Sequence, residues 1–211
     1  MWVKDGDWNT LCLPFNATLT GDLANATLME LDTEGTYEGN KKTGLDDSDG
    51  TLYLYFKTAT TIEAGKPYII RWEGTYMGDP IQDPTFTGIT INKTMHNADF
   101  TGGSFRGNYD ARTFDAENKS ILLVGGNNLY WPLAGASIKA CRAYFELTNG
   151  SAVREFKLNF GDDESAGITT TDFTDYTDKA GVWYMLDGRK LDGKPTRKGL
   201  YINNGVKVVI K

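Results

Sequence analysis

The sequence of 211 residues is 40% hydrophobic and 12% aromatic, which is enough to form a packed core and too much for a disordered chain. Its 22 basic and 28 acidic residues give a net charge of −6, which argues against nucleic-acid binding and against polybasic attachment to anionic lipid. One histidine and two cysteines leave too few ligands for an ordinary zinc site. The sequence contains no apolar run of about 18 residues, the length that a membrane-spanning helix needs.

Strand-like sequence begins close to the start of the chain. Residues 1–20 lack the basic start and apolar stretch of a secretory signal. Residues 8–15 (WNTLCLPF) already have the character of a strand. We therefore expect the native protein to carry a leader, and further domains, upstream of Met1.

Two strong strand patterns follow. Residues 52–56 (LYLYF) place two leucines and a phenylalanine on one side of a strand and two tyrosines on the other. Residues 67–73 alternate more clearly, because Tyr68, Ile70 and Trp72 share one face.

The next part of the chain predicts more short strands. Residues 120–124 and 129–131 flank a Gly-Gly-Asn-Asn turn and predict a hairpin. Residues 137–147 and 153–160 predict two further strands, separated by Thr-Asn-Gly-Ser. Many short strands at turn-marked intervals predict an all-β fold, an antiparallel β-sandwich of jelly-roll or immunoglobulin-like type, over residues 1–160.

The composition changes after residue 160. Residues 161–181 are acidic and rich in threonine, which predicts a linker or an extended edge segment. Residues 182–211 predict a C-terminal β-hairpin appendage, because 200–203 and 206–210 flank Asn204-Gly205, a strong hairpin turn. So short a block buries little surface by itself, and we expect it to dock on the sandwich or on another protein.

The residues that carry hydrolytic chemistry do not assemble into a recognisable motif. His96 lies in a polar turn without a nucleophile elbow, which predicts an exposed loop histidine. Cys12 and Cys141 lie in apolar strand-like sequence; a disulfide between them stays open, but two buried free thiols are the preferred interpretation. Acids on or near predicted strands show no paired spacing and are explained as solvated outer-face residues, namely Glu63, Glu73, Asp83, Glu146 and Glu155. We expect no catalytic residue.

One acidic turn invites comparison with a calcium loop. In residues 45–50, Asp47, Asp49 and Gly50 fit the third, fifth and sixth loop positions. Leu45 then occupies the first ligand position and Phe56 that of the bidentate glutamate, so the motif fails. We expect a solvated turn, and neither a metal nor a cofactor.

Sugar binding is the sharpest alternative function. β-Sandwiches bind glycans by stacking sugar rings on exposed aromatic side chains. Trp72 and Trp131 share faces with aliphatic residues, the latter with Leu129 and Leu133, and are therefore expected in the core. Trp2 and Trp8 flank Lys-Asp-Gly-Asp and are the candidate ligand-binding pair across that turn.

The C-terminal block resembles a known lineage of tails. Residues 183–191 (WYMLDGRKL), 199–202 (GLYI) and 205–211 (GVKVVIK) resemble the tails of secreted and surface proteins of Bacteroidetes. In relatives that use the type IX secretion route, a similar tail is a β-sandwich sorting domain. Residues 8–15, 64–70 and 142–145 are similar to the β-rich modules that precede such tails. The resemblance implies an extracytoplasmic address, secreted or at the cell surface, and transfers no catalytic residue.

These observations predict a non-catalytic structural, anchoring or interaction module of a secreted or cell-surface bacterial protein. Its expected partners are other modules of the native protein or surface proteins. The alternative is a carbohydrate-binding module attached to a glycan-degrading enzyme. A stand-alone hydrolase is the least favoured interpretation.

Overall fold

A computed structural model describes residues 2–125 and 128–160, and the backbone of residues 183–185, 190–191, 199–203 and 206–210. The chain divides into two compact units, Met1–Thr171 and Asp172–Lys211. The predicted linker 161–181 lies outside the described residues. Among the described residues the fold is all-β, as predicted, and no helix is long and apolar enough to cross a membrane.

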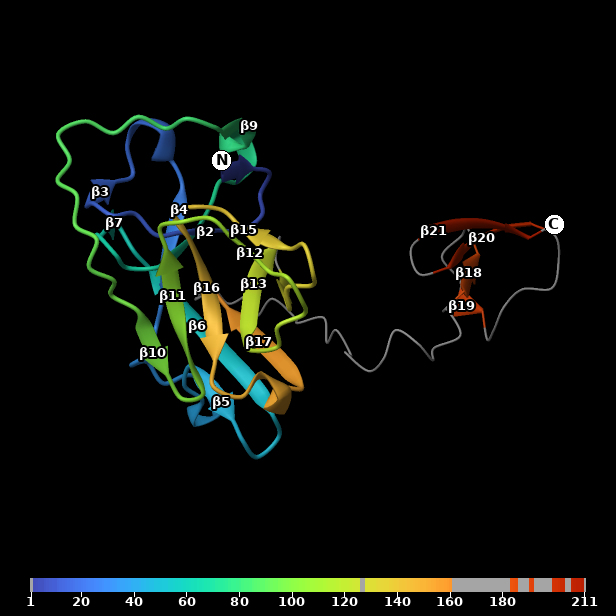
Figure 1. Cartoon of the computed structure of the whole chain (residues 1–211). Coiled ribbons are helices and arrows are strands. Elements are labelled where there is room, and N and C mark those ends of the chain that lie inside the picture. Colours follow the sequence, from blue (N-terminus) through green and yellow to red (C-terminus); the bar gives the residue numbers. More distant parts are fainter. Residues whose placement is uncertain are drawn as a thin grey trace. The chain divides into compact units, whose positions relative to one another are not determined.

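The first unit contains a six-stranded sheet. Its order is β17-β6-β4-β8-β2, with β5 beside β6 (Figure 1). The strands are β2 (Asn9–Leu11), β4 (Thr27–Leu31), β5 (Gly44–Asp46), β6 (Thr51–Thr58), β8 (Tyr68–Arg71) and β17 (Glu155–Asn159). All pairs are antiparallel except β17 with β6, which run parallel. The antiparallel sandwich is therefore confirmed with one parallel ladder.

A five-stranded antiparallel sheet lies against it (Figure 1). Its order is β10-β11-β16-β13-β14. The strands are β10 (Ala98–Phe100), β11 (Gly103–Asn108), β13 (Ile121–Gly125), β14 (Asn128–Tyr130) and β16 (Arg142–Leu147). Leu123 of β13 is opposite Tyr130 of β14, so the hairpin predicted at 120–131 is confirmed.

Short elements complete the unit. Three two-stranded antiparallel sheets pair β1 (Trp2–Lys4) with β9 (Gly78–Ile81), β3 (Ala17–Thr18) with β7 (Thr61–Ile62), and β12 (Arg112–Thr113) with β15 (Ser137–Ile138). The 3₁₀ helices are η1 (Gly21–Leu23), η2 (Glu38–Asn40), η3 (Gly74–Tyr76) and η4 (Gly150–Ala152).

The main core lies between the two large sheets. Leu52, Leu54 and Phe56 of β6 face Phe105 of β11 and Phe145 of β16. The rings of Phe105 and Phe145 stack with centroids 4.5 Å apart, and Phe56 meets Phe105 edge-on at 6.3 Å. Each fully buried phenylalanine stabilises the fold by about 1.5–3 kcal/mol through removal of apolar surface from water. The predicted inner face of 52–56 is therefore the core face.

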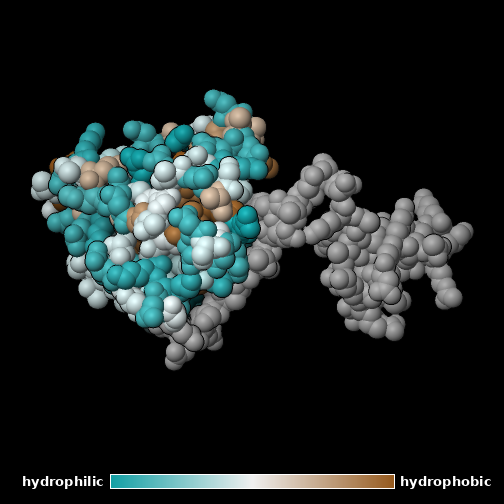
Figure 2. Space-filling model, turned by 90° about the horizontal axis from the view of Figure 1, so that it is seen from below, coloured by the Kyte–Doolittle hydropathy of each residue, from teal (hydrophilic) through white to brown (hydrophobic). Residues whose placement is uncertain are grey.

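The six-stranded sheet is buried on its other face as well. Tyr68, Ile70 and Trp72 form a second cluster there with Leu11 and Leu28, which confirms the predicted shared face of 67–73. The segment 82–97, which joins β9 to β10, runs along one side of the unit (Figure 1). The outer surface in Figure 2 is mostly hydrophilic, with small separate hydrophobic patches.

One predicted strand is interrupted. Residues 137–147 form β15 and β16 with a break between them, instead of a single strand. Cys141, just before β16, has a φ of 57°, a left-handed conformation that cannot continue a strand. The chain therefore turns at 139–141 and changes from the β12–β15 ribbon to the five-stranded sheet.

The second unit contains a four-stranded antiparallel sheet of order β19-β18-β20-β21. The strands are β18 (Trp183–Met185), β19 (Lys190–Leu191), β20 (Gly199–Asn203) and β21 (Val206–Ile210). The β20–β21 ladder pairs Asn203 with Val206, which agrees with the predicted hairpin.

Candidate functional site

A polar cavity of about 270 Å³ lies between the β1–β2 loop, the β13–β14 hairpin and the start of β16. Its polar lining contains two carboxylates, an amide, two aliphatic hydroxyls and two cations, and its lining also contains two aromatic rings. The residues that carry these groups are Asp5, Asp7, Asn9, Thr10, Ser137, Lys139, Arg142, Trp8 and Tyr130.

A local hydrogen-bond network shapes the turn that carries Asp5 and Asp7. The backbone N–H of Asp7 donates to Asp5 Oδ1 at 3.1 Å, and Gly6 between them has a φ of +91°. The Asn9 Nδ2 donates to the Val3 carbonyl at 2.9 Å and to the Asp7 carbonyl at 3.3 Å. The sequence Asp-Gly-Asp therefore forms a tight turn, which the amide of Asn9 ties to β1.

Arg142 is one of the two cationic residues that line the cavity. Its Nη1 donates to the Thr10 carbonyl at 3.0 Å and to Asn9 Oδ1 at 3.3 Å. Its guanidinium also lies 5.4 Å from the centre of the Trp2 ring, within cation–π range. Burial lowers the pKa of Arg142 to about 10, so the side chain is still charged at neutral pH.

Trp2 and Trp8 do not form the predicted exposed pair. They are only 5% and 3% exposed and belong to different hydrophobic clusters. Trp2 donates its Nε1–H to the Thr10 carbonyl at 3.3 Å, whereas Trp8 stacks on Phe160 with ring centroids 4.9 Å apart. The opposite phase of Trp8 relative to Leu11 places it on the other face of the sheet, inside the main core. The prediction that these two rings form an exposed stacking platform is therefore wrong.

The exposed aromatic residue at the cavity is Tyr130. It belongs to the predicted hairpin at 129–131, but the sequence pattern alone assigned it no binding role. It is 41% exposed, while its neighbours Leu129 and Trp131 are buried. The alternation of 129–131 carried the signal for this position. Trp131 is in the core as predicted, whereas Leu133, which was expected to share its face, is 63% exposed.

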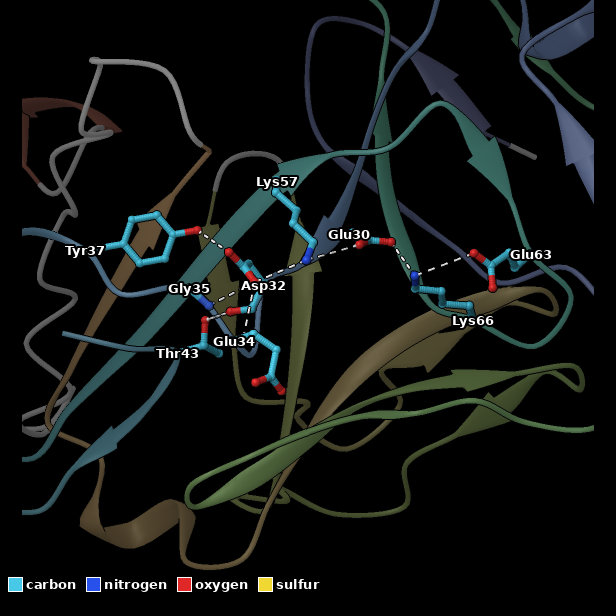
Figure 3. Close-up of polar contacts among 9 residues, drawn as sticks. All are labelled: Glu30, Asp32, Glu34, Gly35, Tyr37, Thr43, Lys57, Glu63 and Lys66. Atoms are coloured by element: carbon cyan, nitrogen blue, oxygen red, sulfur yellow. Dashed lines mark hydrogen bonds and ion pairs between the residues drawn. The ribbon is translucent and has the colours of Figure 1, made fainter. Parts of the chain in front are cut away.

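A second polar site lies beside β4 and β6 of the six-stranded sheet (Figure 3). The carboxylate of Asp32 accepts hydrogen bonds from the Tyr37 hydroxyl at 2.7 Å, from the backbone N–H groups of Glu34 and Gly35 at 3.2 and 3.1 Å, and from Lys57 Nζ at 3.3 Å. Burial alone would raise the pKa of Asp32, but these hydrogen bonds outweigh it and lower the pKa below its usual value.

The Asp32 site continues as a chain of ion pairs. Lys57 also pairs with Glu30 at 3.5 Å, and Glu30 pairs with Lys66, which reaches Glu63 at 3.9 Å. Figure 3 shows these side chains in a row. Each carboxylate has a cationic neighbour, so the arrangement orders the surface of the sheet.

The remaining acids considered for hydrolysis are also surface groups. Glu73 pairs with Arg71 at 3.1 Å, Glu155 with Lys157 at 3.8 Å, and Glu146 with Arg106; Asp83 is exposed. Their interpretation as outer-face acids agrees with the structure. His96 is exposed in the segment 82–97, as predicted. Among the described residues no group of three His, Cys, Asp or Glu side chains is arranged to hold a metal ion.

The carboxylates of the acidic turn at 45–50 accept hydrogen bonds from neighbouring residues. Asp46 accepts from Lys41 Nζ at 2.5 Å and from the Ser48 hydroxyl at 2.6 Å, while Asp49 accepts from the Thr51 N–H at 2.8 Å. The hydrogen bond from Lys41 lowers the pKa of Asp46. The turn is therefore stabilised by hydrogen bonds from its own neighbours.

The two cysteines are free thiols. Cys12 is fully buried and Cys141 is half-buried. Burial raises the pKa of Cys12 to about 12 and also raises the pKa of Cys141. The thiolate is therefore disfavoured at both positions at neutral pH.

A larger hollow of about 640 Å³ lies elsewhere on the unit, beside β3, η1 and β7. Its lining is rich in threonine, and Phe86, which packs on Phe15 with centroids 4.9 Å apart, forms one wall. Asp22 and Glu63 are its two acids. Its lining has no lysine or arginine beside this aromatic ring, unlike the cavity at Tyr130 and Arg142.

Comparison with known protein families, with curated proteins and with solved structures finds no match to this chain.

Proposed function

We propose that this chain is a non-catalytic structural, anchoring or interaction module of a secreted or cell-surface bacterial protein. The resemblance of residues 183–211 to Bacteroidetes tails supports the extracytoplasmic address. The pairing of surface acids with lysines and arginines supports a structural role for those acids. The observation that carries the proposal is the position of β17 as the last strand of the six-stranded sheet among the described residues.

Strand β17 is suited to contact with a neighbouring module. Within the part of the chain that the structure describes, it pairs with β6 and is the last strand in the order of its sheet. Lys157 of β17 is 46% exposed and lies 5.5 Å above the Tyr53 ring. A strand at the end of a sheet can accept a strand or loop of a partner through backbone hydrogen bonds.

A site-specific photo-crosslink in the source cells tests the proposal. A photoreactive residue is placed at Lys157, and the matched control is placed at Lys93, which is exposed in the segment 82–97. The proposal predicts one defined extracytoplasmic partner that is joined from position 157 and not from position 93. A cytoplasmic partner, or equal labelling from both positions, would contradict it.

Carbohydrate binding is the second candidate, and the cavity beside Tyr130 favours it. A half-exposed aromatic ring lies next to two carboxylates, an amide and two cations, which is the combination that stacks a sugar ring and hydrogen-bonds its hydroxyls. The stacking residue in this proposal is Tyr130, in place of Trp2 and Trp8. A module of this kind would serve an attached glycan-degrading enzyme.

A glycan array distinguishes the two candidates. If the cavity binds sugar, the wild type gives a reproducible signal that Tyr130→Ala lowers by about tenfold, since loss of one stacking contact costs about 1–1.5 kcal/mol. The control is Tyr76→Ala, because Tyr76 is 53% exposed and lies outside the cavity. A blank array, or equal loss in both variants, would remove the carbohydrate candidate and leave the interaction module.

A further inference from the structure

Cys12 and Cys141 are neighbours in space although they are 129 positions apart in the sequence. The backbone N–H of Cys12 donates to the Cys141 carbonyl at 3.1 Å. Cys12 follows the last residue of β2, and Cys141 precedes the first residue of β16. The pair therefore lies where an end of the six-stranded sheet meets an end of the five-stranded sheet.

The hydrogen bond places the backbones of the two cysteines side by side. Chain segments joined by such a hydrogen bond lie about 5 Å apart. A disulfide requires a Cα–Cα separation of about 4.4–6.8 Å. Cys141 lies outside the ladder in a turn, with a φ of 57°, so its position is not fixed by strand pairing.

The side chain of Cys12 packs closely against Gly107 of β11. A Cβ atom added to Gly107 of β11 would overlap the Cys12 Sγ, so glycine is required where β11 passes this thiol. The two sulfurs also share electrostatic neighbours. Burial raises the pKa of Cys12, and a negative charge on Cys141 raises it further. Burial likewise raises the pKa of the Tyr109 hydroxyl, and negative charges on the two cysteines add to that increase.

We propose that Cys12 and Cys141 form an intramolecular disulfide when the folded chain meets a small-molecule disulfide oxidant such as oxidised glutathione. The thiolate of Cys141, the more accessible sulfur, attacks one sulfur of the oxidant, forms a mixed disulfide and releases one glutathione thiolate. The deprotonated Cys12 then attacks the Cys141 sulfur and releases the second glutathione. Two thiols are oxidised, one oxidant disulfide is reduced, and both protein protons end on glutathione.

Such a bond would join the two sheets covalently. It would close a loop that contains most of the first unit, and long loops give the largest reduction in unfolded-chain entropy. An oxidising compartment outside the cytoplasm is where bonds of this kind persist. The inference stands on the geometry of the pair and does not depend on the proposed partner or sugar.

The test uses the full chain in native buffer. Reduced protein is incubated with a glutathione redox buffer, quenched with N-ethylmaleimide and analysed by mass spectrometry. The expected product is a monomer that has lost two hydrogens, carries no adduct, and yields tryptic peptides 5–41 and 140–142 joined by a disulfide. The expected midpoint of thermal unfolding is about 10 °C higher than that of the reduced chain.

Two variants keep the test decisive. Cys141→Ser is expected to give no joined peptides and no oxidant-dependent change of the unfolding midpoint, and Cys12→Ser is expected to retain a Cys141 that forms a glutathione adduct. In the wild type, two separate maleimide or glutathione adducts on a folded monomer would overturn the proposal. A disulfide-linked dimer as the only oxidation product would overturn it as well.

Discussion

The hydrogen bonds of Asp32 make its charge a measurable part of the stability of the first unit. In Asp32→Asn the side chain keeps its size and its Oδ1, so the hydrogen bonds from the Glu34 and Gly35 N–H groups are retained. The charge-assisted bond from Tyr37 and the ion pair with Lys57 are weakened.

The magnitude follows from these two contacts. A hydrogen bond to a charged acceptor contributes about 1.5–3 kcal/mol, and about half of that is retained if the Tyr37 hydroxyl turns to accept from the new amide. Lys57 has a side chain that is 48% exposed, so its pair with Asp32 contributes less than about 1 kcal/mol. We therefore expect Asp32→Asn to lower the free energy of unfolding by about 2 kcal/mol at neutral pH.

The pH dependence of this loss has a definite sign. The pKa of Asp32 is lower in the folded chain than in the unfolded chain, so its charge stabilises the fold above the unfolded pKa. That contribution disappears as the pH falls through the folded pKa. The difference between wild type and Asp32→Asn is therefore expected to be full at neutral pH and to shrink below about pH 4.

Urea unfolding followed by tryptophan fluorescence at several pH values measures the difference. Glu34→Gln is the matched control, because it removes the same charge from an exposed side chain two residues away. It is expected to change the free energy of unfolding by less than about 0.5 kcal/mol. An equal effect of the two variants, or a difference between wild type and Asp32→Asn that does not change with pH, would refute the reasoning.

Three further outcomes are expected. Gly65→Ala should lower the free energy of unfolding by about 2–4 kcal/mol in chemical denaturation, because Gly65 has a φ of +79° and its added Cβ would overlap a backbone carbonyl; an unchanged midpoint would contradict this. Phe105→Ala should cost about 3–5 kcal/mol in the same assay, whereas Leu133→Ala should cost less than about 0.5 kcal/mol, and similar costs would argue against the assigned core. In the reduced chain at about pH 8, maleimide should label Cys141 faster than Cys12, whose pKa is raised to about 12; faster labelling of Cys12 would contradict its burial.

Local patterns predicted the strands that carry alternating side chains. Leu52, Leu54 and Phe56 are in the main core, and Trp72 is buried with Tyr68 and Ile70 in the second one, because period-two alternation determines which residues share a face. The pattern failed where the chain leaves a strand. After Tyr130 the ladder ends, and the alternation that placed Leu133 on the same face as Trp131 no longer applies.

The features that could not be predicted from the sequence depend on contacts between segments far apart in the chain. The parallel ladder between β17 and β6 joins segments about a hundred positions apart, and no local signal encodes it. Trp2 is buried because β1 pairs with β9, far along the chain, and the cavity at Tyr130 arises from three separate segments. The proximity of Cys12 and Cys141 has the same origin.

The address of the chain is the central claim, and surface accessibility on intact source cells tests it most directly. Cells are treated with an added protease that does not enter them, and the chain is followed with an antibody to the first unit, beside a cytoplasmic marker. The account predicts that the chain is found in the medium or is degraded on intact cells while the marker is protected. A chain that stays protected until the cells are lysed would contradict it.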